Sequence, residues 1–175
     1  MRHAKSDWND LKLADKARPL NQRGRIAAPI MAQWIFENDL MPDIVLCSSA
    51  VRTQQTLELM VQYWFALPNV SSIIHQPEIL IEDNLYLASE STILAVAKSA
   101  PNLESKQRLL VLGHNPGMEN LASIMSQCVI EMPTGAIAVL DSNSQESVWP
   151  VDWSSSKLWN WRCLVKPREI DGNAI

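Results

Sequence analysis

The chain has 175 residues, of which 47% are hydrophobic and 19% are charged, and its formal net charge is -4. This length and composition suit one globular domain with a sizeable core. The negative charge, with no dense Lys/Arg cluster, argues against a nucleic-acid partner, because phosphate backbones bind to basic faces.

No apolar run in the sequence approaches the roughly 20 residues that span a bilayer, and no basic segment followed by an apolar one opens it. We therefore expect no membrane partner and a cytoplasmic location. Three widely separated cysteines, Cys47, Cys128 and Cys163, fit reduced thiols better than a disulfide framework. Their spacing contains no CxxC pair, so we expect no bound metal.

Helical and strand patterns alternate from about residue 21 onward, which is typical of an α/β sheet covered by helices. The first predicted helix runs toward Asn38 and begins at Asn21, a good N-cap. Its expected apolar face recurs at every fourth residue and comprises Ile26, Ile30 and Trp34. The continuous apolar run at residues 43–47 predicts a parallel strand that is buried on both faces.

The second predicted helix begins near Ala50, and its buried face comprises Leu57, Met60, Val61 and Trp64. Residues 78–81 indicate a weak strand or an extended loop, and a third helix is expected over about 89–99. Residues 108–112 form the clearest strand pattern. The helix after it carries an apolar face of Met118, Leu121, Ala122 and Met125.

Two further strands are predicted over residues 135–141 and 157–165, and residues 166–175 are expected to form a C-terminal tail. We find no internal repeat and no composition change that would mark a linker. The sequence therefore predicts one α/β domain over residues 1–165, with a mostly parallel central sheet.

Two polar motifs follow predicted strands where the chain turns into a helix. Arg52 lies in Ser48-Ser49-Ala50-Val51-Arg52-Thr53, and His114 lies in Gly113-His114-Asn115-Pro116-Gly117. Ligands of open parallel sheets bind beyond the carboxyl ends of the strands, where helix N-termini favour anions. Arg2 and His3, at the start of the chain, supply a second guanidinium and a second imidazole. We therefore expect a phosphoryl-binding pocket in which the arginines neutralise charge.

These residues resemble the motifs of the histidine phosphatase superfamily, in its small, SixA-like phosphohistidine phosphatase branch. Five blocks occur in the family's order: Arg2-His3-Ala4-Lys5-Ser6 with Trp8-Asn9, Arg18-Pro19-Leu20-Asn21 with Gly24, Ser48 to Thr56, Leu85 to Ser89, and Gly113 to Gly117. An Arg-His pair alone is a weak signal. Five blocks in register over nearly the whole chain are highly specific.

The resemblance implies a three-layer αβα fold and a phosphatase that needs no metal or cofactor. It implies that His3 becomes phosphorylated and is then hydrolysed, while Arg2, Arg52, His114 and Asn9 hold the phosphate. Family members with a general acid carry it just before the segment matching Leu85-Tyr86. Asp83 is therefore the first candidate and Glu82 the second. Each is about as readily explained as a solvated loop carboxylate.

The expected substrate is a phosphorylated protein, through a phosphohistidine, or a small phosphorylated molecule. A phosphoester alkoxide needs a proton donor more than a phosphohistidine imidazole does. His114 is expected to be charged or to donate a hydrogen bond to the transferring group. Cys47, at the end of an apolar strand, is interpreted as a small core residue. The sequence leaves the oligomeric state open.

Family members carry an apolar strand immediately before the Arg-His pair, whereas here only Met1 precedes it. Burial of about four apolar side chains is worth roughly 6 to 12 kcal/mol, comparable to the stability of a domain. We expect either a start upstream of Met1, a gap in the sheet, or a poorly held nucleophile, and we favour the first. The alternatives to a phosphatase are a phosphoglycerate mutase-like transferase and, on account of the short N-terminus, a non-catalytic phosphate-binding module.

Overall fold

The computed structural model describes residues 1–66, 76–143, 149 and 152–171. Strand β1 (Ile44–Ser48) lies at the centre of a three-stranded parallel sheet, between β2 (Glu78–Glu82) and β3 (Leu109–Leu112). Strands β4 (Ile137–Ser142) and β5 (Trp159–Val165) form a separate antiparallel pair. The predicted α/β class with a parallel central sheet is confirmed, and each predicted strand is present.

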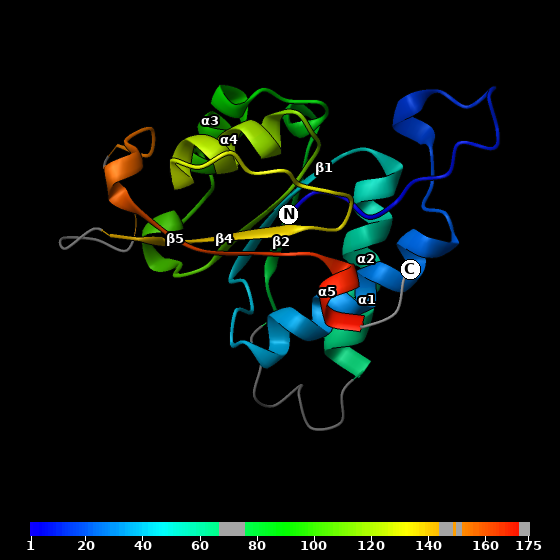
Figure 1. The fold of residues 1–175 in the computed structure, drawn as a ribbon, viewed down its shortest axis with the longest axis horizontal. Coiled ribbons are helices and arrows are strands. Elements are labelled where there is room, and N and C mark those ends of the chain that lie inside the picture. Colours follow the sequence, from blue (N-terminus) through cyan, green and yellow to red (C-terminus); the bar gives the residue numbers. More distant parts are fainter. Residues whose placement is uncertain (67–75, 144–148, 150–151, 172–175) are drawn as a thin grey trace.

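Helices cover both faces of the strands (Figure 1). Helices α1 (Gln22–Glu37), α2 (Val51–Ala66) and α5 (Pro167–Asp171) lie on one side. Helices α3 (Glu90–Lys98) and α4 (Gly117–Ser126) lie on the other. Short 3-10 turns span Asp15–Ala17, Asp83–Leu85, Leu103–Ser105 and Ser156–Leu158.

Strand β1 is apolar from Ile44 to Cys47 because both of its faces are buried in hydrophobic clusters. Ile44 and Leu46 pack in the cluster that contains the α3 and α4 side chains. Val45 and Cys47 pack in the other cluster, with side chains of α1 and α2. Successive side chains of a strand point to opposite faces, so the run of apolar residues serves two cores.

Helix α1 begins as predicted, since the Asn21 side chain accepts a hydrogen bond from the Gly24 N–H at 2.9 Å. The predicted apolar face of this helix is only partly correct, because Trp34 packs against the core whereas Ile26 is 43% exposed. The buried residues are instead Gly24, Ala27, Ala28, Met31, Ala32 and Ile35. Small side chains let α1 approach α2 closely, and the Trp64 indole of α2 donates to the Ala32 carbonyl at 2.9 Å.

The predicted C-terminal tail is also partly wrong. Residues 167–171 form helix α5, which packs against α1. Pro167 occupies its first position, where the fixed φ of proline suits a helix and the missing N–H costs no hydrogen bond. Helix α5 therefore adds to the helical layer that α1 and α2 form on this side of the strands.

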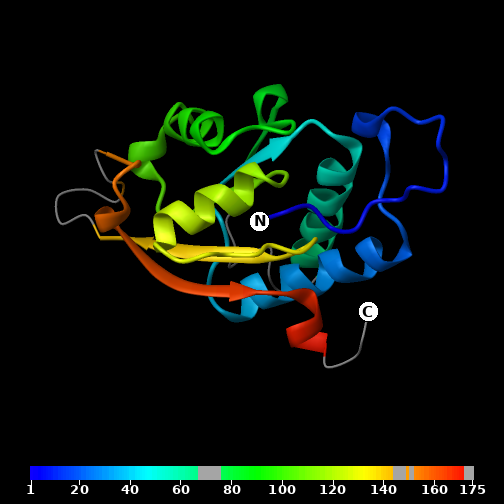
Figure 2. The ribbon, with the colours of Figure 1, turned by 45° about the horizontal axis from the view of Figure 1, so that its top comes forward.

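The first three residues lie between the two groups of strands, and Figure 2 shows the N-terminus at the centre of the molecule. Arg2 bridges Gly113 in parallel register, and the His3 N–H donates to the Gly113 carbonyl at 3.1 Å. On the other side, the Arg2 N–H donates to the Ala136 carbonyl and the Gly135 N–H to the His3 carbonyl. Residues 1–3 therefore act as a short strand that links β3 to the β4 side.

The Met1 amine continues this ladder. It donates to the Val111 carbonyl at 2.7 Å, where the backbone N–H of a longer parallel strand would donate. The amine is fully buried, and burial lowers its pKa to about 5. Met1 therefore carries a neutral amine at pH 7.

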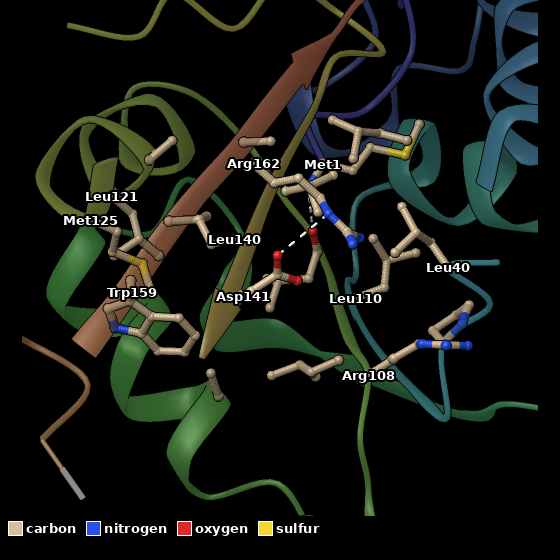
Figure 3. Close-up of a pocket in the computed structure, with 18 of the residues that line it drawn as sticks. Met1, Leu40, Arg108, Leu110, Leu121, Met125, Leu140, Asp141, Trp159 and Arg162 are labelled. Carbon is tan, nitrogen blue, oxygen red and sulfur yellow. Dashed lines mark hydrogen bonds and ion pairs between the residues drawn. The ribbon is translucent and has the colours of Figure 1, made fainter. Parts of the chain in front are cut away.

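Beyond Met1, β3 and β4 are separated by a cavity of about 500 Å³. Figure 3 shows Met1 at one end of it, with side chains such as Leu110, Leu140 and Trp159 around it. Asp141 of β4 and Arg162 of β5 form an ion pair of 3.4 Å at its wall. The cavity has the position that a strand between β3 and β4 would fill, and the alternatives of an upstream start and of a gap in the sheet both stay open.

Among the helices that the structure describes, none is long and apolar enough to cross a membrane.

Candidate active site

His3 is held by its backbone and by its ring. The bonds to Gly113 and Gly135 fix its main chain, and its side chain is buried. Ring atom Nδ1 lies 2.7 Å from the Ala4 carbonyl oxygen, which can only accept, so Nδ1 carries the proton. Burial lowers the pKa of His3 to about 4, and the nearby Arg52 and Arg2 contribute to this. The lone pair of Nε2 is therefore available at neutral pH.

Arg52 connects the two imidazoles. It lies in the first turn of α2, as the sequence predicts, and is 4% exposed. Its Nε donates to His3 Nε2 at 3.3 Å, and its Nη2 lies 3.3 Å from His114 Nδ1. One edge of the guanidinium thus faces both histidines, and the other edge binds Asp15.

His114 follows β3 and is almost fully buried. Its ring centroid lies 5.1 Å from that of His3. Because Arg52 can only donate, His114 Nδ1 accepts, and Nε2 donates to Ser48 Oγ at 2.7 Å. Burial lowers the pKa of His114 to about 3, and His3 and Arg52 contribute. His114 is therefore neutral at pH 7, with its proton on Nε2.

Arg2 supplies the second guanidinium, whose charge adds to burial in lowering the pKa of both His3 and His114. Its Nη1 donates to the Met132 carbonyl at 2.8 Å. Its Nε is buried and has no hydrogen-bond partner among the described residues. Burial lowers the pKa of Arg2, and the charge of Arg52 lowers it as well. A buried N–H without a partner costs free energy, so this N–H is able to bind an acceptor.

Asp15 and Tyr86 complete the site, and neither of them was predicted from the sequence. Asp15 Oδ2 accepts from Arg52 Nη2 at 2.9 Å and from the Tyr86 hydroxyl at 2.8 Å. The main-chain carbonyl of Asp15 accepts from Arg52 Nη1 at 2.6 Å. The Tyr86 ring packs edge-on against His114, with centroids 5.5 Å apart. Asp15 stands three residues before the Arg18 motif, and this spacing was the only signal in the sequence.

The two candidate acids lie at the rim. The Asp83 side chain is 81% exposed and pairs with Lys16 Nζ at 2.7 Å. Bonds from Lys16 and from the Ser49 hydroxyl hold the pKa of Asp83 below its usual value, which opposes a role as proton donor. Glu82 ends β2 beside Ser48.

Asn9 is not part of this network. It is exposed in the segment before the Asp15 turn, and its backbone N–H donates to Asp7 Oδ1 at 2.8 Å. The Cys47 thiol is buried beside the site, and burial raises its pKa to about 12. A thiol in this state is a poor nucleophile, which agrees with its interpretation as a core residue.

The four residues His3, Arg2, Arg52 and His114 thus lie together, although they come from three distant parts of the chain. The site thus combines two arginines with two neutral imidazoles. This arrangement suits a tetrahedral anion. Within the described ranges, no three His, Cys, Asp or Glu side chains are grouped as a metal site.

No family model matches the chain. It is 32% identical, over 171 residues, to an uncharacterized chloroplastic protein of Arabidopsis thaliana, covering 95% of this chain and 76% of that one. Among solved structures it is similar to a protein of Agrobacterium tumefaciens assigned as the phosphohistidine phosphatase SixA. That match has 25% identity, a TM-score of 0.71 and 95% coverage of both chains.

The fold also matches the protein histidine phosphatase SixA in complex with tungstate, with a TM-score of 0.73. There the identity is 21%, and the match covers 98% of this chain and 97% of that one. These likenesses agree with the five sequence blocks and with the grouping of their histidines and arginines. The chain belongs to the histidine phosphatase superfamily and has the fold of its SixA-like members.

Proposed function

We propose that the protein is a metal-independent phosphatase that works through a phosphohistidine at His3. The observation that carries this proposal is the hydrogen bond from His3 Nδ1 to the Ala4 carbonyl. It leaves the Nε2 lone pair directed at a space that Arg52 and His114 also face. A fixed tautomer and a fixed direction are what a nucleophilic imidazole needs.

In the first step, His3 Nε2 forms a bond to phosphorus while the bond from phosphorus to the leaving group breaks. The leaving group takes the electron pair of that bond. Arg52 Nε and Nη2 turn from the two imidazoles to the phosphoryl oxygens, and Arg2 Nε gains the partner that it lacks. Preorganised donors of this kind stabilise the charge that develops in the transition state, which is usually the main source of rate enhancement.

In the second step, water attacks the phosphorus of phospho-His3, and the bond to Nε2 breaks. His3 Nε2 recovers its lone pair, and the phosphate leaves with the oxygen and both protons of the water. The bound anion raises the affinity of His114 for a proton. The protonated His114 then donates to the phosphoryl group in both steps. Its bond to Ser48 keeps the ring in place during this change.

The substrate class follows from the leaving group. An alkoxide requires a proton as it departs, whereas the imidazole of a protonated phosphohistidine leaves as a neutral ring. Asp83 is held ionised by Lys16 and Ser49, and Asp15 by Tyr86 and Arg52. Carboxylates that stay ionised are poor proton donors. We therefore propose a phosphohistidine, carried by a protein, as the preferred substrate over small phosphoesters.

The test is hydrolysis of p-nitrophenyl phosphate in the presence of a chelator, by the wild type and by His3→Ala. We expect turnover that resists the chelator and disappears in the variant. Turnover that survives His3→Ala unchanged would contradict the proposal. Binding of tungstate without turnover would indicate the non-catalytic phosphate-binding module instead.

A further inference from the structure

We propose that Asp15 selects for phosphorylated imidazole, by accepting a hydrogen bond from the ring N–H of the leaving group. This inference rests on the proposed function and assigns a role to a residue that the phosphate-binding set does not include. Asp15 comes from the 3-10 turn Asp15–Ala17, which precedes α1. It is therefore independent of the strand-to-helix turns that supply Arg52 and His114.

The position of Asp15 follows from burial. His3, Arg52 and His114 are at most 7% exposed, so the nucleophile attacks from the interior. In-line displacement then places the leaving group on the opposite, solvent side of the phosphorus. The side chain of Asp15 is 39% exposed and touches the outer edge of Arg52. It stands where a leaving group from solvent meets the phosphate pocket.

The two oxygens of Asp15 differ. Oδ2 is used by Arg52 and by the Tyr86 hydroxyl. Oδ1 lies 4.0 Å from Arg18 Nε, which is beyond hydrogen-bond length. The bonds on Oδ2 fix the plane of the carboxylate and leave Oδ1 able to accept. A preorganised acceptor of this kind loses little entropy when it binds a donor.

The chemistry requires no proton from Asp15. The phosphorylated ring carries its proton on the nitrogen that is not bonded to phosphorus, and this N–H donates to Oδ1. When the P–N bond breaks, its electron pair goes to the ring nitrogen and the ring leaves neutral, still carrying that proton. Asp15 remains a carboxylate throughout. Its charge favours the protonated, reactive form of the substrate, and it opposes a leaving group that departs as an anion.

A simpler explanation is that Asp15 only anchors Arg52. The two explanations differ in substrate dependence, because loss of an anchor lowers the rate for every phosphoryl donor. Loss of the charge lowers the rate for the P–N donor selectively. Asp15→Asn tests this, since an amide oxygen can still accept from Arg52 and Tyr86 but carries no charge.

The experiment compares kcat/KM for phosphoimidazole with kcat/KM for p-nitrophenyl phosphate in each variant. A carboxylate within about 6 Å shifts the protonation of a neighbouring cation by one unit or more, so we expect the ratio to fall roughly tenfold in Asp15→Asn. The alkaline limb of kcat for phosphoimidazole should move to lower pH by about one unit. Asp15→Glu, which restores the charge, should recover part of the ratio.

Asp39→Asn is the matched control, because it removes the charge of an exposed carboxylate that pairs with Arg108 and has no contact with Arg52 or Tyr86 among the described residues. Its ratio should stay at the wild-type value. Equal losses with both substrates in Asp15→Asn, with an unmoved pH limb, would overturn this inference and leave the phosphatase proposal intact. Absence of turnover and of phosphoenzyme in the wild type would overturn both.

Discussion

Arg52 Nε lies 3.3 Å from Nε2 of His3 and directs its N–H at that lone pair. The same guanidinium reaches His114 Nδ1 at 3.3 Å. The two imidazole nitrogens thus accept the hydrogen bonds that, in the proposed first step, phosphoryl oxygens accept from this arginine edge. The site is preorganised, because no donor has to be brought in from elsewhere.

Replacement of Arg52 by lysine should disable the site. A lysine ammonium cannot reproduce the flat edge that faces both imidazoles, nor the two bonds to Asp15. We expect kcat for p-nitrophenyl phosphate to fall by about 100- to 1,000-fold. Arg162→Lys, on the half-exposed Arg162 of β5, is the matched control and should keep wild-type activity. A loss below tenfold in Arg52→Lys would show that the guanidinium is not the main phosphoryl clamp.

Asp83→Asn should have a small effect. Asp83 is exposed and held ionised by Lys16 and Ser49, so it is poorly suited to protonate a leaving group. Loss of a general acid typically costs about 100-fold or more, and we expect much less here, even with phenyl phosphate, whose leaving group needs a proton. A loss of that size with phenyl phosphate, and none with p-nitrophenyl phosphate, would restore Asp83 as the acid.

The free energy of unfolding should decrease as the pH falls from 8 to 5. The pKa values of the Met1 amine, His3 and His114 are lowered to about 5, 4 and 3 in the folded protein. The unfolded chain therefore binds more protons, over the window from about pH 8 for the amine and from about pH 6.5 for the histidines. Above this window the three groups are neutral in both states and do not change the free energy of unfolding. As the pH falls toward their folded-state pKa values, protons bind mainly to the unfolded chain, so the free energy of unfolding decreases. Urea denaturation at several pH values measures the slope, and a flat profile would contradict the assigned burial.

The cavity between β3 and β4 should accept a strand. Extension of the chain at Met1 by four Val and Ile residues would continue the ladder that the amine begins at Val111. It would also replace a buried amine with an amide. Because each buried apolar side chain contributes roughly 1.5 to 3 kcal/mol, we expect the free energy of unfolding to rise by about 3 kcal/mol or more.

A Gly/Ser extension of equal length is the control for the strand, since it offers backbone hydrogen bonds without apolar side chains. Thermal denaturation of both extended proteins and of the wild type gives the comparison. Equal stability of the two extensions would show that the cavity does not bind the added side chains.

Much of the fold could be predicted because its local signals agree with its packing. Strand β1 is apolar on both faces because two cores meet there, and Asn21 caps α1 as its position indicates. The predicted face of α1 is partly wrong because periodicity favours the largest apolar side chains as the core. Close packing against α2 selects alanines instead, and Ile26 remains exposed. Which residues of α1 are buried depends on the helix that packs against it. Periodicity within α1 carries no information about that neighbouring helix.

The site was predicted to a similar extent. Arg52 and His114 could be placed because strand-to-helix turns converge at one edge of a parallel sheet. Asp15 could not, since it lies in an irregular segment whose course depends on bonds to Arg52 and Tyr86. The same limit applies to Asn9, which the resemblance implied as a phosphate ligand and which is exposed outside the network.

Trapping of a phosphoenzyme would decide whether His3 is the nucleophile. The protein is mixed with a phosphoryl donor, quenched in alkali within a turnover and mapped by mass spectrometry. The chain has three histidines, so a phosphohistidine can form at three positions at most. We predict an acid-labile, alkali-stable phosphoryl group on His3 that is absent in His3→Ala and present in His75→Ala. Full turnover with no such group on His3, or a phosphoryl group on His114 or His75 instead, would show that another group carries the reaction.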